Sequence, residues 1–221
     1  MAEESLWTRI VREDPQHSQR YVQRFRDMAA AGADLDGEAR MVDAMLPRGA
    51  RVLDAGCGPG RVGGALARAG HDVVGVDVDP VLIAAAQEDH PGPRWLVGDL
   101  AELDLPARGV AGGFDVVVCA GNVVAFLAPG TRGEVLRRLR AHLRPGGRVV
   151  CGFGAGRGYA VEEFLADARG AGLEPDVLLS TWDLRPHAPG SDFLVAVLSP
   201  AGGAGRGPGG DRAEDRAEGP G

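Results

Sequence analysis

The chain has 221 residues, of which 44% are hydrophobic, so it is long enough for one domain with appendages that needs neither disulfides nor metal to fold. The net charge is −7 and no dense basic run occurs, which argues against large nucleic-acid substrates. The three cysteines form no CxxC pair, and no apolar leader or bilayer-length run is present, so we expect a cytoplasmic protein without a membrane partner.

Residues 1–48 are predicted to form helices that precede the main domain. Apolar side chains recur at helical spacing in two stretches, Leu6, Trp7, Ile10 and Val11, then Tyr21, Phe25 and Met28. Asp14 and Pro15 are typical of the N-cap and first turn of a second helix, and a third helix is expected over residues 36–46. Because a free-standing helix could not bury Tyr21 and Phe25, we expect this segment to close over a site as a lid.

Residues 49–199 alternate between strands and helices, which predicts an α/β domain with a parallel sheet covered on both faces. The expected strands are 51–55, 72–76, 94–97, 115–119, 148–153, 176–182 and 193–198. Helices are expected after Gly60, over 81–89, over a stretch carrying Val135, Leu136, Leu139 and Leu143 that ends before Pro145, and over 161–171. The last two strands have no helix between them and should pair as an antiparallel hairpin.

Residues 200–221 consist almost entirely of Gly, Pro, Ala and charged residues. Such a segment has too little apolar surface to form a core, so we expect a disordered tail. The chain is thus predicted to contain a helical segment (1–48), one α/β domain (49–199) and a tail (200–221).

A glycine-rich turn follows the first predicted strand and reads Asp54-Ala-Gly-Cys-Gly-Pro-Gly-Arg-Val-Gly63. Glycines let a ligand approach the backbone and leave N–H groups free at a helix N-terminus. Gly58, Gly60 and Gly63 satisfy a G-x-G-x-x-G pattern, and Asp77 lies nineteen residues after Gly58. This spacing is compatible with a nicotinamide dinucleotide site of an NAD(P)-dependent oxidoreductase or epimerase, or with a tight turn that binds nothing.

Three features favour a cationic ligand over a dinucleotide. Asp54 precedes the first glycine, where an anion would disfavour phosphate but would stabilise an ammonium or sulfonium group. Further polar side chains follow later strands, namely Asp99 and Asn122. Little chain remains after the predicted hairpin to build the substrate half of a dehydrogenase.

The ordered segments VLDAGCGPGRVGGAL, VVGVDVDP, VGDL, FDVVVCAGN and LRPGGRVV resemble the successive motifs of class I S-adenosylmethionine (SAM)-dependent methyltransferases, over about Arg51 to Leu198. The resemblance implies a Rossmann-like three-layer sandwich with a seven-stranded, mostly parallel sheet, strand order 3-2-1-4-5 for its first five strands, and an antiparallel terminal hairpin strand. It also implies SAM as cofactor and methyl transfer by in-line displacement.

The same resemblance implies roles for the first turn. Asp54 would lie near the methionine ammonium group. The backbone of Gly56, Gly58 and Gly60, with Cys57 in the same turn, would surround the methionine and ribose parts of SAM.

The later motifs would hold the adenosine. Asp77 would accept hydrogen bonds from the ribose hydroxyls, and Val78 would pack on adenine. Asp99 would accept from the adenine amino group, and the Leu100 N–H would reach a ring nitrogen.

Ala120 and Asn122 would line the edge where the methyl group meets its acceptor, but no acceptor-specific motif follows them. Candidates for acceptor chemistry are Asn122, His17, Tyr21 and Arg157. Packing or surface roles are the alternative for His17 and Tyr21. Arg157 would bind an anionic acceptor or belong to a plain connection. We expect a small-molecule acceptor, with a non-catalytic SAM-binding module as the remaining alternative.

Cys57, Cys119 and Cys151 are expected to act as small apolar fillers, with Cys57 and Cys119 near the cofactor edge of the sheet. No His lies near them in the sequence, and a zinc site usually needs four ligands, so no metal is expected.

Overall fold

The computed structural model describes residues 3–202 of the chain. The helices in this range are α1 (Leu6–Glu13), α2 (His17–Ala30), α3 (Gly37–Ala44), α4 (Arg61–Arg68), α5 (Pro80–Asp89), α6 (Val123–Phe126), α7 (Arg132–Ala141) and α8 (Val161–Gly170). The strands are β1 (Arg51–Ala55), β2 (Asp72–Asp77), β3 (Arg94–Val97), β4 (Phe114–Cys119), β5 (Leu143–Gly154), β6 (Leu173–Leu179) and β7 (Phe193–Pro200). Short 3-10 turns are η1 (Leu100–Glu102), η2 (Pro106–Arg108) and η3 (Pro129–Thr131).

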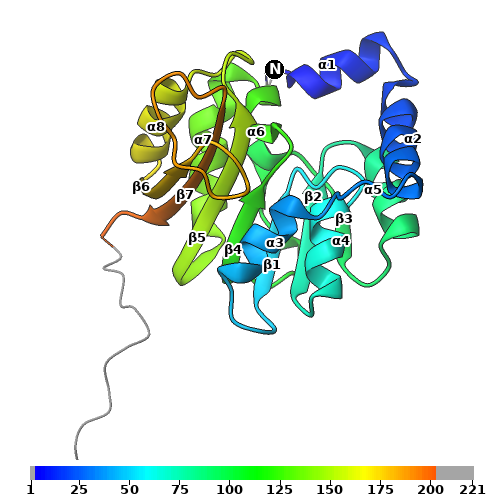
Figure 1. Ribbon diagram of the computed structural model, residues 1–221, viewed down its shortest axis with the longest axis horizontal. Coiled ribbons are helices and arrows are strands. Elements are labelled where there is room, and N and C mark those ends of the chain that lie inside the picture. The colour runs from blue at the N-terminus through cyan, green and yellow to red at the C-terminus, as the bar shows by residue number, and fades with distance from the viewer. Residues whose placement is uncertain (1–2, 203–221) are drawn as a thin grey trace, which may run out of the picture.

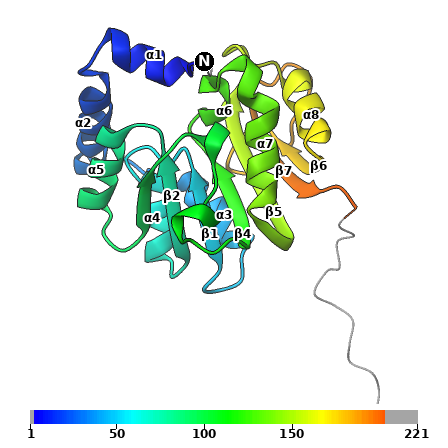
Figure 2. The ribbon, with the colours of Figure 1, turned by 180° about the vertical axis from the view of Figure 1, so that it is seen from behind.

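The seven strands form one sheet in the order β3-β2-β1-β4-β5-β7-β6. β1 to β5 are parallel to their neighbours, whereas β7 is antiparallel to both β5 and β6. Figure 1 shows α3 and α4 on the near face of the sheet, and Figure 2 shows α7 and α8 on the other face. The predicted three-layer α/β sandwich, its strand order and its antiparallel terminal hairpin are therefore confirmed.

The core consists of two layers because the side chains of each strand alternate between the faces of the sheet. In β4, Val116 and Val118 belong to the layer that contains α3 and α4, while Val117 and Cys119 belong to the layer under α7 and α8. All six residues of β4 are buried, as expected for a central strand covered on both faces. Because β1 to β5 run parallel, their carboxyl ends lie along one edge of the sheet, where the loops that follow the strands can bind a ligand.

The start of α2 differs from the sequence prediction. The helix begins at His17, and Asp14 ends α1 rather than capping α2 in its first turn. The Asp14 carboxylate accepts a hydrogen bond from the Gln16 N–H at 3.3 Å, while the His17 N–H donates to the Asp14 carbonyl at 2.9 Å. Asp14 and Pro15 therefore form a turn that joins the two helices.

The strands β5 and β6 begin earlier than expected. Leu143 lies in β5 rather than in the preceding helix, because it pairs with Phe114 across an irregularity that accommodates Pro145. β6 starts at Leu173 because β7 continues to Pro200 and pairs with it there. Trp182 is not part of β6; a Cβ added at Gly152 would lie 2.2 Å from its ring, so the indole packs directly over that glycine. The short helix α6 was not predicted.

The N-terminal helices have two different positions. α3 packs on α4 and on the sheet, so it belongs to the core. α2 packs along α5, where Val22 contacts Leu82 and Ala85. In Figure 1, α1 lies above the carboxyl ends of the strands, and its N-terminus is near α6. Only α1 and α2 thus occupy the place expected for a lid.

Residues 203–221, which make up most of the predicted tail, lie outside the described residues. Between residues 3 and 202, none of the helices has the length and apolar character that crossing a membrane requires.

Candidate functional site

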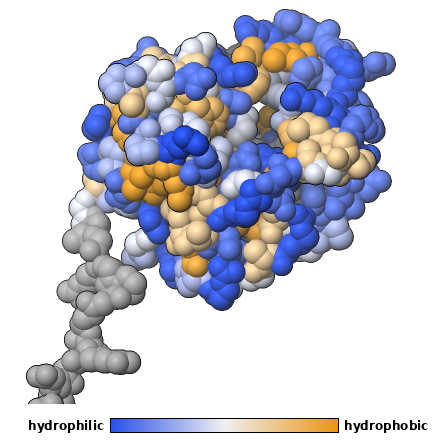
Figure 3. Space-filling model, viewed as in Figure 1, coloured by the Kyte–Doolittle hydropathy of each residue, from blue (hydrophilic) through white to orange (hydrophobic). Residues whose placement is uncertain are grey.

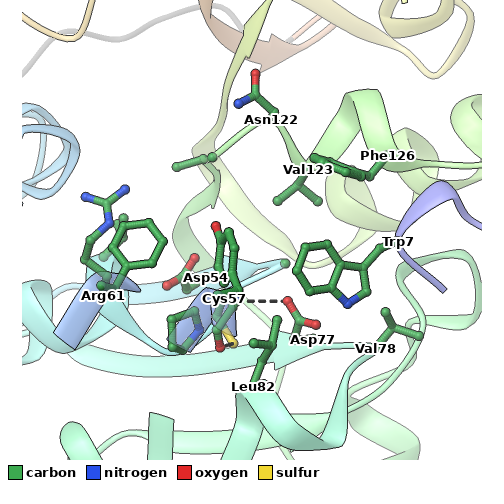
Figure 4. A pocket seen from close by; sticks show the side chains of 18 of the residues that line it. Trp7, Asp54, Cys57, Arg61, Asp77, Val78, Leu82, Asn122, Val123 and Phe126 are labelled. Carbon is green, nitrogen blue, oxygen red and sulfur yellow. Dashed lines mark hydrogen bonds between the residues drawn. The ribbon is translucent and has the colours of Figure 1, made fainter. Parts of the chain in front are cut away.

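A cavity of about 650 Å³ lies at the carboxyl edge of the parallel strands, beneath α1 and α2. In Figure 3 the molecular surface is hollowed beside the N-terminal helices, and Figure 4 shows the side chains that line the cavity. The structure brings together here all but one of the residues proposed for the site: Asp54, Gly56, Cys57, Gly58, Asp77, Val78, Asp99, Leu100, Ala120 and Asn122, together with His17, Tyr21 and Arg157.

Gly60 is the exception, because it does not line the cavity. Its φ is +83°, and an added Cβ would lie 2.9 Å from the Ala86 Cβ and 3.1 Å from the Trp95 ring. The glycine is therefore required for the left-handed start of α4 and for close packing on α5 and β3. Its place beside the cofactor stays a prediction, since the glycine lies between two cavity-lining residues, Pro59 and Arg61.

The other two glycines of the turn do face the cavity. Gly56 and Gly58 have φ values of +75° and +54°, a conformation that favours glycine. A Cβ at Gly56 would also lie 2.4 Å from a methyl group of Val123 in α6. Their missing side chains leave room where the turn approaches the cavity.

Asp77 ends β2 and is 9% exposed. One of its carboxylate oxygens accepts from the Gly58 N–H at 2.8 Å, and the other accepts from the Asp79 N–H at 2.9 Å. Burial raises the pKa of Asp77 to about 6 despite these bonds. Each carboxylate oxygen has a second lone pair, so Asp77 can still accept hydrogen bonds from a ligand.

Asp54 lies near the end of β1 and is 2% exposed. It accepts a hydrogen bond from the Gly63 N–H at 2.8 Å, and burial raises its pKa to about 7. Two buried carboxyl groups with raised pKa values in one cavity are stabilised in their ionised form by a positively charged ligand.

Val78, which follows β2, and Asp99 and Leu100 at the start of η1 line another part of the cavity. Val78 is 36% exposed although it is apolar. Asp99 caps η1 by accepting a hydrogen bond from the Ala101 N–H at 2.8 Å, and Leu100 is buried beside it. An exposed valine opposite a turn with an exposed acid provides an apolar wall and a hydrogen-bond acceptor for a flat base.

Asn122 follows β4 with φ 68°, in the left-handed region. Its side-chain oxygen accepts from the Gly154 N–H at 2.7 Å, which ties the ends of β4 and β5 together. A Cβ at Gly154 would lie 3.0 Å from the Arg157 Nε, so this guanidinium is adjacent to Asn122. Ion pairs within residues 3–202 neutralise Arg61 through Glu38, but none involves Arg157.

The N-terminal wall of the cavity is aromatic. The Trp7 ring packs edge-on against His17, Tyr21 and Phe126, with centroid separations of 5.2, 5.2 and 5.9 Å. Trp7 and Phe126 were missed as site residues. The helical spacing of Trp7 indicated a buried face without saying what covers it, and Phe126 lies in the unpredicted helix α6.

Two side chains of this wall, Tyr21 and His17, are candidates for acceptor chemistry. Burial raises the pKa of Tyr21, which keeps its hydroxyl protonated. The His17 ring is engaged by the edge of Trp7. Tyr21 therefore cannot take a proton from an acceptor in this state, and His17 stays the candidate base of the wall.

The three cysteines are free and buried. Cys57 lines the cavity, and burial raises the pKa of its thiol. Cys119, expected near the cofactor edge, does not line the cavity; it lies in the core layer under α7 and α8 opposite Cys151. Among residues 3–202, no three His, Cys, Asp or Glu side chains form a group suited to a metal ion.

Comparison with known proteins identifies the family. Residues 52–147 match a family model described as "Methyltransferase domain". A TehB-like SAM-dependent methyltransferase from Corynebacterium glutamicum is 50% identical, with a TM-score of 0.80 over 85% of this chain and 100% of that chain. The structure of SAM-bound CalS10, an amino pentose methyltransferase from Micromonospora echinaspora, matches at a TM-score of 0.62 and 22% identity over 79% and 95% of the two chains.

A curated relative, the ribosomal protein L11 methyltransferase of Methylococcus capsulatus, is 37% identical over 64% of this chain and 46% of its own length. The chain spans about half the length of the curated relatives it matches first, with shares of 46%, 48% and 46%.

The cavity fits SAM on its own geometry. Two buried acids with raised pKa values suit a positively charged ligand that also carries hydroxyl donors, and the open backbone at Gly56 and Gly58 leaves room for it. Together with the relatives, this fit makes SAM the cofactor and overturns the alternative of a nicotinamide-dependent oxidoreductase. The chain belongs to the class I SAM-dependent methyltransferases.

Proposed function

We propose that this methyltransferase transfers the methyl group of SAM to an anionic small molecule that enters between the N-terminal helices and the ends of β4 and β5. The observation that carries the proposal is Arg157, which lines the cavity beside Asn122 without a carboxylate partner among residues 3–202. A guanidinium placed at the edge of a cavity attracts and orients an anion. Arg24 lines the same cavity and would add to this attraction.

The proposed cofactor contacts follow from the side chains that line the other half of the cavity. Asp54 faces the methionine ammonium group, and Gly56 and Gly58 surround the methionine and ribose. Asp77 accepts from the ribose hydroxyls through the lone pairs left by Gly58 and Asp79. Val78 packs on adenine.

Asp99 and Leu100 complete the adenine site in this proposal. Asp99 accepts from the adenine amino group with the oxygen that does not cap η1. Cys57 packs below the turn with Ile83, Ala86 and Trp95, so it contributes shape rather than chemistry.

SAM supplies an activated methyl group, so the protein contributes alignment and exclusion of water, which are worth about 7–11 kcal/mol in favourable cases. Asn122 and Ala120 shape the edge where acceptor and methyl meet. The aromatic wall of Trp7, Tyr21 and Phe126 excludes water from that edge. An acceptor that arrives with a free lone pair needs no base, which agrees with the protonated hydroxyl of Tyr21 at this wall.

The acceptor class is inferred from the side chains that line the cavity, because the fold does not determine it. Two of the three named relatives act, by their names, on ribosomal protein L11 and on an amino pentose. A cavity of about 650 Å³ lies within the usual range for small-molecule sites, roughly 300–1,000 Å³. Three reduced, buried cysteines support the further proposal that the protein works in the cytoplasm.

Two measurements test the proposed function. Calorimetric titration with SAM, S-adenosylhomocysteine (SAH) and NAD should give binding of the first two only. Labelled SAM should then transfer its methyl group to a component of an anionic metabolite fraction, and not to ribosomal protein. Binding without turnover on any fraction would instead support a non-catalytic SAM-binding module.

The arginine assignment has its own test. Arg157→Gln should raise the KM for the acceptor by about tenfold and change the KM for SAM by less than twofold. Arg185→Gln is the matched control, because Arg185 is exposed in the hairpin loop and pairs with Asp183. Equal effects of the two substitutions would remove Arg157 from the acceptor site.

A further inference from the structure

Asp79 joins the N-terminal helices to the cofactor cavity through one carboxylate. It caps α5, where one oxygen accepts from the Val81 N–H at 2.8 Å. The other oxygen accepts from the Trp7 Nε1–H of α1 at 2.9 Å and from the Ser18 hydroxyl of α2. Asp79 is 4% exposed and Ser18 is fully buried, so these bonds are shielded from water.

The same residue fixes the acid proposed to bind ribose. The Asp79 N–H donates to one Asp77 oxygen, and the Gly58 N–H donates to the other. A continuous series of hydrogen bonds therefore runs from Trp7 through Asp79 and Asp77 to the glycine-rich turn. Figure 4 shows the Trp7 ring beside Asp77 and Val78, over the cavity.

α1 has few other attachments, which makes the Trp7 bond important. The helix has no buried residue. Beyond Asp79, Trp7 contacts His17 and Tyr21 of α2 and Phe126 of α6. Just before the helix, the Glu3 carboxylate accepts from the Gly130 N–H at 2.7 Å. α1 therefore bridges the cavity from the start of α5 to the segment after α6.

α2 is attached more firmly. Val22 is buried against α5, and Arg26 pairs with Glu88 and Asp89 at 2.8 Å each. Loss of the Asp79 contacts would consequently release α1, while α2 would stay on α5.

We propose that Asp79 is a positioning residue that latches α1 over bound SAM and at the same time sets the Asp77 carboxylate for the ribose. This inference rests on the proposed placement of SAM in the cavity. The latch consists of the Trp7, Ser18 and Asp79 side chains. Opening it breaks the Trp7–Asp79 bond, so SAM enters and SAH leaves when α1 lifts.

Asp79→Asn tests the latch with little effect on α5. Asparagine caps helices as well as aspartate does, so its oxygen can keep the Val81 bond. The Trp7 N–H is only a donor, and the asparagine amide nitrogen cannot accept a hydrogen bond from it. We expect SAH to dissociate about tenfold faster and the KM for SAM to rise, with kcat unchanged or higher.

A double-mutant cycle separates the latch from general packing. Trp7→Phe retains a ring and removes the donor, so it should also accelerate SAH release. In the Asp79→Asn background it should add almost nothing, because the bond is already lost. Ser18→Ala gives a second, smaller change on the same carboxylate.

Two matched controls should behave like the wild type. Asp104→Asn changes another capping acid, which accepts from the Ala107 N–H at 3.1 Å and does not line the cavity. Trp182→Phe changes a tryptophan that packs over Gly152.

Limited trypsin digestion tests the latch without any ligand. The chain contains no lysine, and Arg9 and Arg12 lie on α1, so cleavage after them reports the release of this helix. Asp79→Asn should speed that cleavage about tenfold, and SAH should slow it in the wild type more than in the variant. Thermal melts of both proteins identify any general unfolding.

The outcomes separate this inference from the proposed function. Failure of the wild type to bind SAM or SAH refutes the proposed function, while the ligand-free cleavage still tests the latch. Wild-type binding with an Asp79→Asn release rate within twofold of normal overturns the latch. It is also overturned if Trp7→Phe has its full effect in the Asp79→Asn background, or if ligand-free cleavage after Arg9 and Arg12 is unchanged.

Discussion

The Gly58 N–H and the Asp77 carboxylate lie 2.8 Å apart, so the acid at the end of β2 holds the glycine-rich turn in place without a ligand. A group that supports the turn and also binds the ribose contributes twice to affinity, through preorganisation and through direct contact. This double role determines how substitutions at Asp77 are interpreted.

Asp77→Ala should weaken SAM binding by about 1–3 kcal/mol, because the ribose hydroxyls lose a charged acceptor. Calorimetry on the folded variant measures the loss. The SAM affinity of Asp77→Asn should lie between those of the wild type and Asp77→Ala, since the asparagine oxygen can keep one main-chain hydrogen bond. Asp72→Ala, at the exposed start of the same strand, is the control. An affinity of Asp77→Ala within twofold of the wild type would show that the ribose lies elsewhere.

SAM affinity should rise by at least about tenfold between pH 5 and pH 8. Burial raises the pKa of Asp77 to about 6 and that of Asp54 to about 7, while ribose hydroxyls and the cationic ligand favour the ionised carboxylates. At pH 5 about one molecule in ten has a group of pKa about 6 ionised and about one in a hundred a group of pKa about 7, so Asp77 alone sets the lower limit of the effect. Calorimetry at several pH values measures it, and a flat profile would argue against both contacts.

The stability of the ligand-free protein should change in the opposite direction. Between about pH 4 and pH 7 the folded state binds more protons at Asp54 and Asp77 than the unfolded state does, so stability falls as pH rises. Asp54→Asn keeps an acceptor for the Gly63 N–H and removes the buried charge. We expect its melting temperature at pH 8 to equal or exceed that of the wild type, although it binds SAM more weakly.

The sequence was sufficient to predict the sheet because hydrophobic runs, turns and the ordered motifs all agree on it. β4, for example, is apolar from Val116 to Cys119 because both its faces are covered. The motif could not show that Gly60 packs against Ala86 and Trp95, since that depends on how α5 and β3 approach the turn.

The contacts of the N-terminal helices with Asp79 also could not be predicted from the sequence. Asp79 is recognisable as a helix cap beside Pro80, but its bonds to Trp7 and Ser18 join residues 72 and 61 positions apart. No local pattern encodes a contact at that separation. Phe126 was missed for a similar reason, because the four-residue helix α6 is too short for a periodic signal.

Deletion of residues 1–30 should abolish methyl transfer and leave a folded core. These residues supply Trp7, Tyr21 and Phe25 to the cavity but no strand to the sheet. The deletion exposes Leu82 and Ala85 on α5, so some loss of stability is expected as well. Circular dichroism checks the core and labelled SAM checks transfer. Full activity of the shortened protein would make the segment dispensable and refute its role as a lid.

Bound SAM should slow the alkylation of Cys57, because this thiol lines the cavity under the turn proposed to hold the cofactor. Burial raises the pKa of the thiol, so labelling of the free protein should already be slow and mass spectrometry over hours is the suitable measurement.

Cys119 and Cys151 are internal controls, since both are fully buried in the core and do not line the cavity. We expect saturating SAM to slow Cys57 labelling and to leave the labelling of the two controls unchanged. Equal Cys57 rates with and without SAM would contradict the placement of the cofactor against this turn, and stoichiometric zinc in the purified protein would overturn the interpretation of the cysteines as apolar fillers.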